Sequence, residues 1–288
     1  MGLLQGVTEL FPVSSLGHGV LLPGLLGWHN LVNSQSASDS FYLAFLVGLH
    51  VGTAIALLVF YWKTWLALFR GTMRQVGVVK SQGIRMVWSL NDPATDKNYR
   101  LFILLVIATI PVGIVGLLFE HNLRTLFVKP LAAAIFLTIN GVILSGGELL
   151  RRIKPTRAKP VTSSTLPVRS TLAIGTTQIA SLFAGISRSG ITMVAGLTAG
   201  MEHEESANFA FLLATPVILL AGLLKIPDLL GPLGNGVRGQ SLVGALCAGV
   251  AAYLSVRFLT KWFNTKTLWP FAIYSLITGL FCIIYFAS

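Results

Sequence analysis

Residues 1–28 read MGLLQGVTELFPVSSLGHGVLLPGLLGW, an apolar stretch that is interrupted around Pro12 to His18. Each apolar arm has about 11 residues and reaches roughly 16 Å as a helix, because one residue rises about 1.5 Å. The hydrocarbon layer of a membrane is about 30 Å thick, so neither arm can cross it alone. We therefore expect a re-entrant helical hairpin whose polar tip lies near the middle of the membrane, enclosed by protein.

A second stretch of the same kind follows later in the chain, over 171–200, and is interrupted around Gly185 to Ser189. Six further apolar stretches are uninterrupted and long enough for membrane-spanning helices of about 20 residues. They cover approximately 41–62, 101–119, 131–150, 206–224, 239–256 and 268–286. The sequence therefore predicts an all-α integral membrane protein.

The composition agrees with this class and excludes others. Hydrophobic residues make up 54% and charged residues 11% of the 288 residues, whereas about 25% is charged in soluble domains. The net charge of +11 does not indicate a nucleic-acid partner, because the basic residues are confined to loops between apolar stretches. Cys247 and Cys282 have no metal-site or disulfide spacing. No cleavable signal peptide is recognised, so we expect an internal span to direct insertion.

Basic residues also predict the orientation. The loops at 63–100, 151–170 and 257–266 hold seven, six and three Lys or Arg residues, while those at 120–130 and 225–238 hold two each. Since basic loops stay on the cytoplasmic side, the first three are expected to be cytoplasmic and both chain ends external.

The two halves of the chain resemble each other. A shift of 173 residues places Gln5 on Gln178, Ser14 on Ser187 and Gly17 on Gly190. Each half reads as a re-entrant helical hairpin followed by three transmembrane helices, so the second half begins on the opposite side of the membrane. This predicts an inverted-topology repeat with its site near the midplane, where the two interruptions meet. The single transmembrane domain, 1–288, then divides into repeat one at about 1–150, a basic cytoplasmic linker at about 151–170, and repeat two at about 171–288.

The first interruption carries groups that can perform chemistry. Gln5 and Glu9 are four residues apart and share a helical face, and a proline then ends that arm, which leaves Ser14, Ser15 and His18 on the turn. A carboxylate, two hydroxyls and an imidazole supply a base, a nucleophile and a proton carrier. For Ser14 alone, capping the second arm is the favoured role. For Glu9 and His18 a functional role is favoured, because ionisable groups are costly to place inside a membrane.

The second interruption carries the only Lys or Arg outside the loops, Arg188, among the hydroxyls of Ser187, Ser189 and Thr192. A guanidinium among hydroxyls suits phosphate oxygens. Its alternative role is to pair with Glu9, and the two roles can coexist. Elsewhere, His50 either faces the site or bonds a neighbouring helix. Asn140 is interpreted as an interhelical hydrogen-bonding residue, and Glu148 as an end-of-helix charge.

These motifs together resemble one family. Gln5-x-x-x-Glu9 with Pro12-Val-Ser14-Ser15-x-Gly17-His18, followed by Gly185-x-Ser187-Arg188-Ser189-x-x-Thr192, resembles the undecaprenyl-diphosphatase family, also called the bacitracin resistance protein family. Phe209-x-Phe211-Leu212-Leu213-x-x-Pro216 and Pro270-Phe271-x-x-Tyr274 also look like family segments. The resemblance covers essentially the whole chain.

The resemblance implies a multi-pass enzyme of the bacterial cytoplasmic (inner) membrane, with its active site toward the outer face. It would hydrolyse undecaprenyl diphosphate to undecaprenyl phosphate and inorganic phosphate, which recycles the lipid carrier for peptidoglycan synthesis and confers bacitracin resistance. Its partners would be the polyprenyl diphosphate and membrane lipids, with a homodimer left open, and its cofactor a divalent cation, Mg²⁺ or Ca²⁺. The implied catalytic residues are Glu9, Ser15, His18 and Arg188, the implied phosphate-binding residues are Ser14, Ser187, Ser189 and Thr192, and the implied metal ligands are Glu9 and Gln5.

The identity of the nucleophile stays open at this stage. Ser15, activated by His18 or Glu9, is the first choice; a phosphohistidine at His18 and direct attack by water are the alternatives. The chain also departs from the family pattern. Gln5 replaces a carboxylate found in some members, so metal binding would depend more on Glu9, and Ala184 stands where a proline is usual. More residues usually precede the first motif, so we expect the natural start to lie further upstream.

A transporter or flippase for polyprenyl phosphates is the rival interpretation. Inverted repeats with broken helices also build many secondary transporters, and a fold alone does not determine a function. The combination of a serine, a histidine and a carboxylate beside an arginine favours hydrolysis, because a carrier needs no nucleophile.

Overall fold

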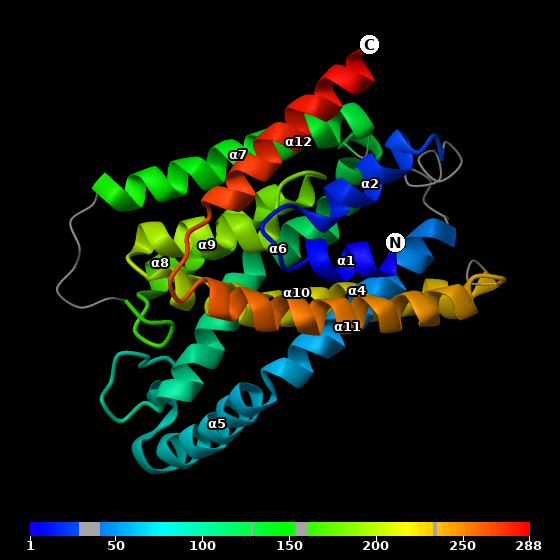
Figure 1. Cartoon of the computed structure of the whole chain (residues 1–288). Helices are drawn as coiled ribbons and strands as arrows, with labels where there is room; N and C mark the ends of the chain where they lie inside the picture. The colour runs from blue at the N-terminus through cyan, green and yellow to red at the C-terminus, as the bar shows by residue number, and fades with distance from the viewer. Residues whose placement is uncertain (29–40, 128, 154–160, 233–234) are drawn as a thin grey trace.

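The computed structural model describes residues 1–28, 41–127, 129–153, 161–232 and 235–288, and within these ranges the regular structure is helical, with no β-strand (Figure 1). Residues 154–160 of the predicted basic linker lie outside the described residues. The chain is thus all-α, as predicted.

Long apolar helices form the body of the molecule. Within the described residues, five are long and apolar enough to cross a membrane: α6 (Lys97–Phe127), α7 (Pro130–Ile153), α10 (His203–Leu230), α11 (Arg238–Trp262) and α12 (Trp269–Ala287). The sixth predicted span corresponds to α4 (Phe41–Phe60), which meets the criterion when counted together with the helix that follows it across a 73° bend. Each of the six predicted spans therefore falls on a helix. Four of these helices extend past both predicted ends, whereas α4 ends two residues earlier and α12 begins one residue later than predicted.

The two interrupted stretches form pairs of short helices. The first pair is α1 (Gly2–Thr8) and α2 (Ser15–Leu25). The second is α8 (Val168–Thr177), which continues as the 3-10 helix η2 (Gln178–Leu182), and α9 (Arg188–Ala199). The first break is earlier than predicted, because α2 begins at Ser15, directly after its capping residue. Ser15 and His18 therefore both belong to a helix, and of the three residues predicted on the turn only Ser14 lies outside it.

The segment 63–100, predicted as a loop, is largely helical. It contains α5 (Trp62–Gln82) and the 3-10 helix η1 (Ile84–Val87). The helix escaped prediction because it is too polar for a membrane span, while its apolar residues recur at helical spacing. In Figure 1, α5 extends away from the main body, with α6 as its packing partner.

Small residues allow the spans to pack closely in pairs. A side chain on Gly52 of α4 would meet the backbone of Ala245 on α11, and one on Gly141 of α7 would lie 2.9 Å from the carbonyl oxygen of Ala272 on α12. Such contacts between small residues bring membrane helices together. The short pairs pack against these spans, α1 on α11 and α2 on α7, so the two turns are held inside the protein.

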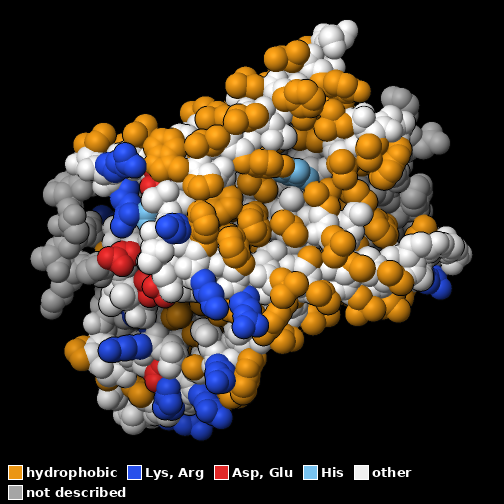
Figure 2. Space-filling view, in the orientation of Figure 1, with side chains coloured by type: hydrophobic (Ala, Val, Ile, Leu, Met, Phe, Trp, Pro, Cys, Tyr) orange, Lys and Arg blue, Asp and Glu red, His pale blue; other side chains and the backbone are white. Residues whose placement is uncertain are grey.

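Most charged side chains lie at one end of the surface. Figure 2 shows Lys, Arg, Asp and Glu gathered at the end that contains α5 and the connections between helices, a further basic side chain at the opposite end, and mainly hydrophobic side chains between them. A continuous apolar surface bounded by a charged end is typical of a protein that spans a membrane.

Candidate active site

The two polar turns meet inside the molecule, where Arg188 Nη2 donates to Glu9 Oε1 across 179 residues of sequence. Glu9 follows α1, and Arg188 is the first residue of α9. Their side chains are only 6% and 16% exposed. A buried carboxylate is stable only when it is paired and hydrogen-bonded, so this ion pair joins the two halves of the chain.

The second carboxylate oxygen of Glu9 is also occupied. Oε2 accepts hydrogen bonds from Ser15 Oγ and, at 2.9 Å, from Gln5 Nε2. His50 Nε2 lies 3.6 Å from the same oxygen. The structure thus brings together Gln5, Glu9, Ser15 and Arg188 from the predicted site. The hydrogen bond from Ser15 places its hydroxyl beside a base.

A cavity of about 200 Å³ lies against this cluster. Its polar lining comprises Glu9, Ser14, Ser15, His50, Ser181, Ser187 and Arg188, and its apolar lining Leu16, Val112, Leu182, Ile186, Val217, Ile218 and Ala221. The lining therefore combines polar side chains that suit a charged group with apolar side chains that suit a hydrocarbon chain.

Two serines act as equivalent helix caps. Ser14 Oγ accepts from Gly17 N at 3.2 Å at the start of α2, and Ser187 Oγ accepts from Gly190 N at 3.2 Å at the start of α9. Ser14 Oγ also accepts from Gly185 N at 3.1 Å, although Gly185 belongs to the other turn. Ser14 has φ +68°, which is uncommon for a residue other than glycine. Ser14 therefore caps α2, which is the role that the sequence favoured for this residue. It also links the two turns.

His18 points away from Ser15 and Glu9. Its Nδ1 lies 2.7 Å from the carbonyl oxygen of Ser14, which can only accept, so Nδ1 carries the proton. Its Nε2 then accepts from the hydroxyl of Tyr274, also at 2.7 Å. Among the described residues, His18 is not part of the cavity lining. Tyr274, noted in the sequence only as part of a family segment, is its partner across 256 residues.

Two other predicted phosphate-binding residues lie off the cavity wall of the described structure. Ser189 Oγ is 3.0 Å from Ser187 Oγ, inside the second turn. Thr192 is buried, and its hydroxyl has no hydrogen-bond partner among the described residues. Of the four predicted phosphate-binding residues, only Ser14 and Ser187 reach the cavity.

His50 supplies the imidazole that does reach the cavity. Its Nδ1 lies 2.8 Å from the carbonyl oxygen of Leu46 in the same helix, so the proton is on Nδ1 and Nε2 faces Glu9. The sequence left open whether His50 faces the site; it does. An ionisable side chain is costly inside a membrane span, and this cost could have indicated from the sequence that His50 faces the site.

Asn140 of α7 is hydrogen-bonded to both turns. Its Nδ2 donates to the carbonyl oxygen of Pro12 at 3.0 Å and to Ser275 Oγ at 3.2 Å. Its Oδ1 accepts from Ser187 N at 3.0 Å. The interpretation as an interhelical hydrogen-bonding residue is confirmed, and the bonds reach the residues next to the reactive groups.

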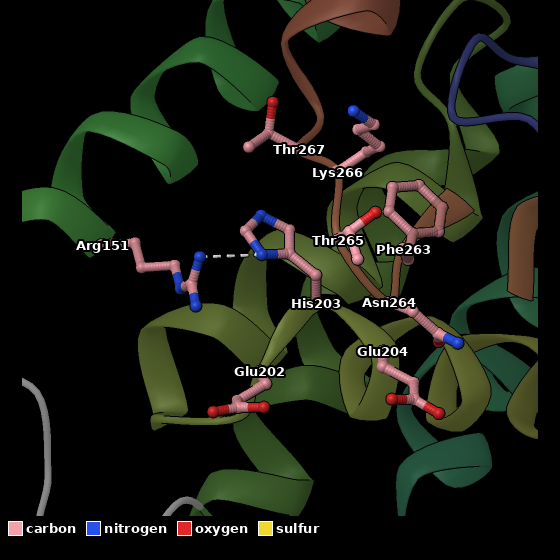
Figure 3. A pocket seen from close by; sticks show the side chains of 9 residues that line it. All are labelled: Arg151, Glu202, His203, Glu204, Phe263, Asn264, Thr265, Lys266 and Thr267. Carbon is pink, nitrogen blue, oxygen red and sulfur yellow. Dashed lines mark hydrogen bonds between the residues drawn. The ribbon is translucent and has the colours of Figure 1, made fainter. Parts of the chain in front are cut away.

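A second polar pocket lies where α7, α10 and the connection between α11 and α12 meet (Figure 3). Arg151 Nη1 donates to His203 Nδ1 at 2.8 Å, so His203 Nε2 carries the proton and donates to Glu148 Oε1 at 2.6 Å. Leu268 N donates to the same oxygen at 2.6 Å. Glu148 is thus a buried link between helices and not a simple end-of-helix charge. No residue of the sequence motifs lines this pocket.

The side chains around Glu9 suit a cation only if a bound ligand supplies further oxygen atoms. Among the described residues, no three His, Cys, Asp or Glu side chains come together as a metal site. Glu9, Gln5 and Ser15 do offer oxygen atoms, which Mg²⁺ and Ca²⁺ prefer. Mg²⁺ is commonly held by one or two carboxylates together with phosphate oxygens. The residues therefore fit a cation that is shared with a bound diphosphate.

Known proteins resemble the chain along almost all of its length. The family model described as bacitracin resistance protein BacA matches residues 1–281. The chain is 47% identical to "Undecaprenyl-diphosphatase 2" of Frankia alni, which covers 100% of this chain and 96% of that protein. It is 48% identical to "Undecaprenyl-diphosphatase" of Mycolicibacterium paratuberculosis, over 97% and 93% of the two chains. The corresponding protein of Granulibacter bethesdensis is 44% identical, over 97% and 92%.

Proposed function

Because the chain belongs to the bacitracin resistance protein BacA family, we propose that it hydrolyses undecaprenyl diphosphate in the cavity between Glu9 and Arg188. The products are undecaprenyl phosphate and inorganic phosphate. The observation that carries this proposal is the ion pair between the two turns, with the Ser15 hydroxyl bonded to the same carboxylate. The apolar wall of the cavity suits the prenyl chain.

Arg188 binds the diphosphate. In the structure its guanidinium is paired with Glu9 and lines the cavity. A guanidinium has five N–H donors, so it can hold phosphate oxygens while it keeps contact with the carboxylate. Ser187, at the start of the same helix, lies on the same wall. These groups offset the charge that spreads over the phosphate oxygens in the transition state.

Ser15 is the nucleophile in this proposal. Its oxygen forms a bond to the terminal phosphorus, and its proton passes to Glu9 Oε2, to which it is already hydrogen-bonded. The bond from the terminal phosphorus to the bridging oxygen breaks, and its electron pair leaves with undecaprenyl phosphate. Glu9 gives this proton to the departing oxygen of undecaprenyl phosphate and is a carboxylate again. It then takes a proton from water, the water oxygen attacks the phosphoserine, and Glu9 passes that proton to Ser15 Oγ as inorganic phosphate leaves.

The two histidines have different tasks. His18 holds the backbone of the Ser14 turn and connects it to Tyr274 on α12, so it positions Ser15 without touching it. His50 faces Glu9 from α4 and contributes to the polar wall that receives the diphosphate.

Glu9 would be the residue that holds a divalent cation, Mg²⁺ or Ca²⁺, together with a bound diphosphate, and Gln5 would support Glu9 through its hydrogen bond. Such a cation offsets negative charge on the diphosphate. Chelation with EDTA is expected to stop phosphate release while the thermal unfolding temperature of the protein stays the same. Unchanged release after chelation would contradict this part of the proposal.

The cavity faces the outer side of the bacterial cytoplasmic membrane in this proposal. Its α10 residues, Val217, Ile218 and Ala221, lie in the half of the helix remote from His203 and the second polar pocket. That pocket contains Arg151 and Lys266, from two of the three basic loops. An inverted repeat accounts for the two matching serine caps.

Phosphate release by the purified protein in detergent tests the proposal and separates hydrolysis from lipid transport, since detergent leaves no second compartment. Farnesyl diphosphate is a soluble substrate for the assay. Glu9→Gln and Arg188→Ala are expected to abolish release. Glu148→Gln is the matched control, because it alters a buried carboxylate that is bonded to His203, away from the cavity, and is expected to keep activity. Normal release by a folded Glu9 or Arg188 variant would remove that residue from the mechanism.

A further inference from the structure

One face of α5 carries a row of exposed apolar side chains. We call this row the α5 stripe; it comprises Trp62, Leu66, Phe69, Met73 and Val76, which are between 36% and 61% exposed. Their spacing of four, three, four and three residues places them on a single face of the helix. Exposed apolar rows of this regularity usually mark a contact with lipid or protein.

The opposite face of α5 is already occupied. Leu68, Gly71 and Gln75 are buried there, and a side chain on Gly71 would lie 2.6 Å from Asn98 Cβ of α6. Gln75 Nε2 donates to the carbonyl oxygen of Met86 at 3.1 Å. The helix therefore has a fixed orientation on α6, and the α5 stripe faces away from the protein body.

Basic residues lie beside the α5 stripe. Lys63, Arg70 and Arg74 are spaced by seven and four residues and form a separate row, and Lys80 follows the stripe at its end. The sequence of α5 contains no Asp or Glu. Two copies of such a helix would repel each other, whereas lipid phosphates would attract it. Figure 2 shows Lys and Arg side chains gathered in the region that α5 occupies in Figure 1.

The direction of α5 also suits a membrane surface. The helix turns by 73° from α4 at Tyr61, so α5 does not run in the direction of the span before it. Trp62 lies at this bend, and Ile84 and Trp88, which follow α5 in the chain, are also exposed, at 74% and 77%. Tryptophan is enriched at the boundary between lipid and water.

We propose that α5 is an interfacial amphipathic helix. The α5 stripe enters the cytoplasmic leaflet at the boundary between headgroups and acyl chains, and Lys63, Arg70 and Lys80 contact the phosphates of anionic lipids. The helix thereby holds the connection between α4 and α6 against the membrane.

Cysteine labelling in lipid nanodiscs tests this placement. The background is Cys247→Ser with Cys282→Ala, and single cysteines replace Phe69, Met73 or Ser81. Ser81 is the matched control, because it is exposed on the side of α5 that carries the basic row. A charged maleimide is expected to react at least tenfold more slowly at positions 69 and 73 than at 81. The difference is expected to disappear in SDS. Equal rates in the nanodisc would overturn the proposal.

The same nanodiscs distinguish lipid from a second copy of the protein as the partner of the α5 stripe. In nanodiscs with anionic lipid, Lys63→Gln combined with Arg70→Gln is expected to speed labelling at position 73 by roughly fivefold. Neutral lipid alone should have a similar effect. If a second copy covered the stripe, oxidation would join cysteines at position 73 into dimers, and nanodiscs with a single copy would label quickly. Either result would contradict the proposal. Phosphate release is measured for every variant, and retained release shows that the variant is folded.

Discussion

Glu9 shows how many groups a single buried carboxylate can organise. Arg188 occupies one of its oxygens, and Ser15 and Gln5 occupy the other, with His50 nearby. Removal of the carboxylate charge leaves Arg188 without its partner in a protein interior, which is costly. The loss of Glu9 is therefore expected to remove the proposed base and also to disturb Arg188, the proposed phosphate-binding residue.

The proposed positioning role of His18 predicts partial rescue by asparagine. In His18→Asn, the side-chain amide can still donate to the carbonyl oxygen of Ser14, whereas His18→Ala cannot. A hydrogen bond contributes about 1 kcal/mol, so kcat/KM is expected to be about fivefold higher for asparagine than for alanine. Steady-state phosphate release measures the difference. If both variants are equally inactive, the imidazole itself takes part in the chemistry.

Asn140 is expected to matter for catalysis through the spacing of the two turns. Asn140→Leu keeps a similar volume but loses the bonds to Pro12 and Ser187, and kcat is expected to fall by about 30-fold, from about 1 kcal/mol per bond. Ser275→Ala removes only the third bond of Asn140 and serves as the control. A fall in thermal stability with unchanged kcat in Asn140→Leu would show that the residue has only a structural role.

The sequence predicted some of these residue roles and missed others for a physical reason. Glu9, Ser15 and Arg188 could be found because charged or hydroxyl groups in the middle of an apolar stretch are costly. The facing directions of His50 and Asn140 depend on how each helix is rotated against its neighbours. A uniformly apolar helix does not reveal that rotation in its sequence.

Among the elements, α6 begins with a well-formed cap. Asp96 Oδ1 accepts from Asn98 N at 2.8 Å and Tyr99 N at 3.3 Å, and Oδ2 accepts from Arg74 Nε at 2.8 Å. Burial alone would raise the pKa of the Asp96 carboxyl group, but these hydrogen bonds and the positive charge of Arg74 outweigh it and lower the pKa. The ionised form thus stabilises the junction of α5 and α6.

Substitution of Asp96 predicts a stability change that depends on pH. Asp96→Ala removes the cap and is expected to lower the free energy of unfolding by about 1 kcal/mol. Asp96→Asn keeps a capping oxygen but loses the charge, so its smaller deficit should be present above the unfolded pKa, near pH 4, and disappear as pH falls through the lower folded pKa. Thermal unfolding in detergent at pH 7 and pH 3 measures both. A deficit of Asp96→Asn that is the same at pH 3 would contradict this explanation.

The predicted elements were accurate where hydrophobicity determines them. Five of the six predicted spans are confirmed as helices long and apolar enough to cross a membrane, and the sixth lies on α4, because a run of apolar residues of that length has few alternatives. The prediction missed α5, whose polar and apolar residues are mixed, and misplaced the start of α2, which depends on the cap at Ser14. Helix boundaries set by side-chain caps are harder to predict than the spans themselves.

For the whole molecule, the critical contact is between Gly17 of α2 and Gly185 of the second turn. A methyl group on Gly17 would lie 2.8 Å from Gly185 Cα and 3.0 Å from its nitrogen, which are backbone atoms. Gly17→Ala is therefore expected to separate the two turns, break the bond from Gly185 N to Ser14, and lower kcat/KM at least tenfold.

Gly19→Ala is the control for this substitution. It adds the same methyl group to the same helix, where no atom lies within 4 Å of the new carbon. This variant is expected to keep its activity and to be as stable as the unchanged protein or slightly more stable. Comparable activity losses in both variants would show that α2 itself, and not the contact between the turns, is sensitive.

The meeting of the two turns could be expected from the paired interruptions, but its details could not. The Glu9–Arg188 pair was weighed as a role for Arg188 because both groups would be buried. The partners that secure the turns come from α7 and α12, at Asn140 and Tyr274. Only the packed arrangement of all the spans brings these side chains to the turns.

Two helices start at the cavity, α2 at Ser15 and α9 at Arg188, so both direct the positive ends of their dipoles toward it. This attraction is fixed, whereas the charge of the bound lipid falls when its terminal phosphate is cut off. The reaction therefore weakens the binding of the lipid product to the protein. Farnesyl phosphate should accordingly inhibit the enzyme less than a non-hydrolysable diphosphate analogue does, and equal inhibition by the two would show that product escape needs another driving force.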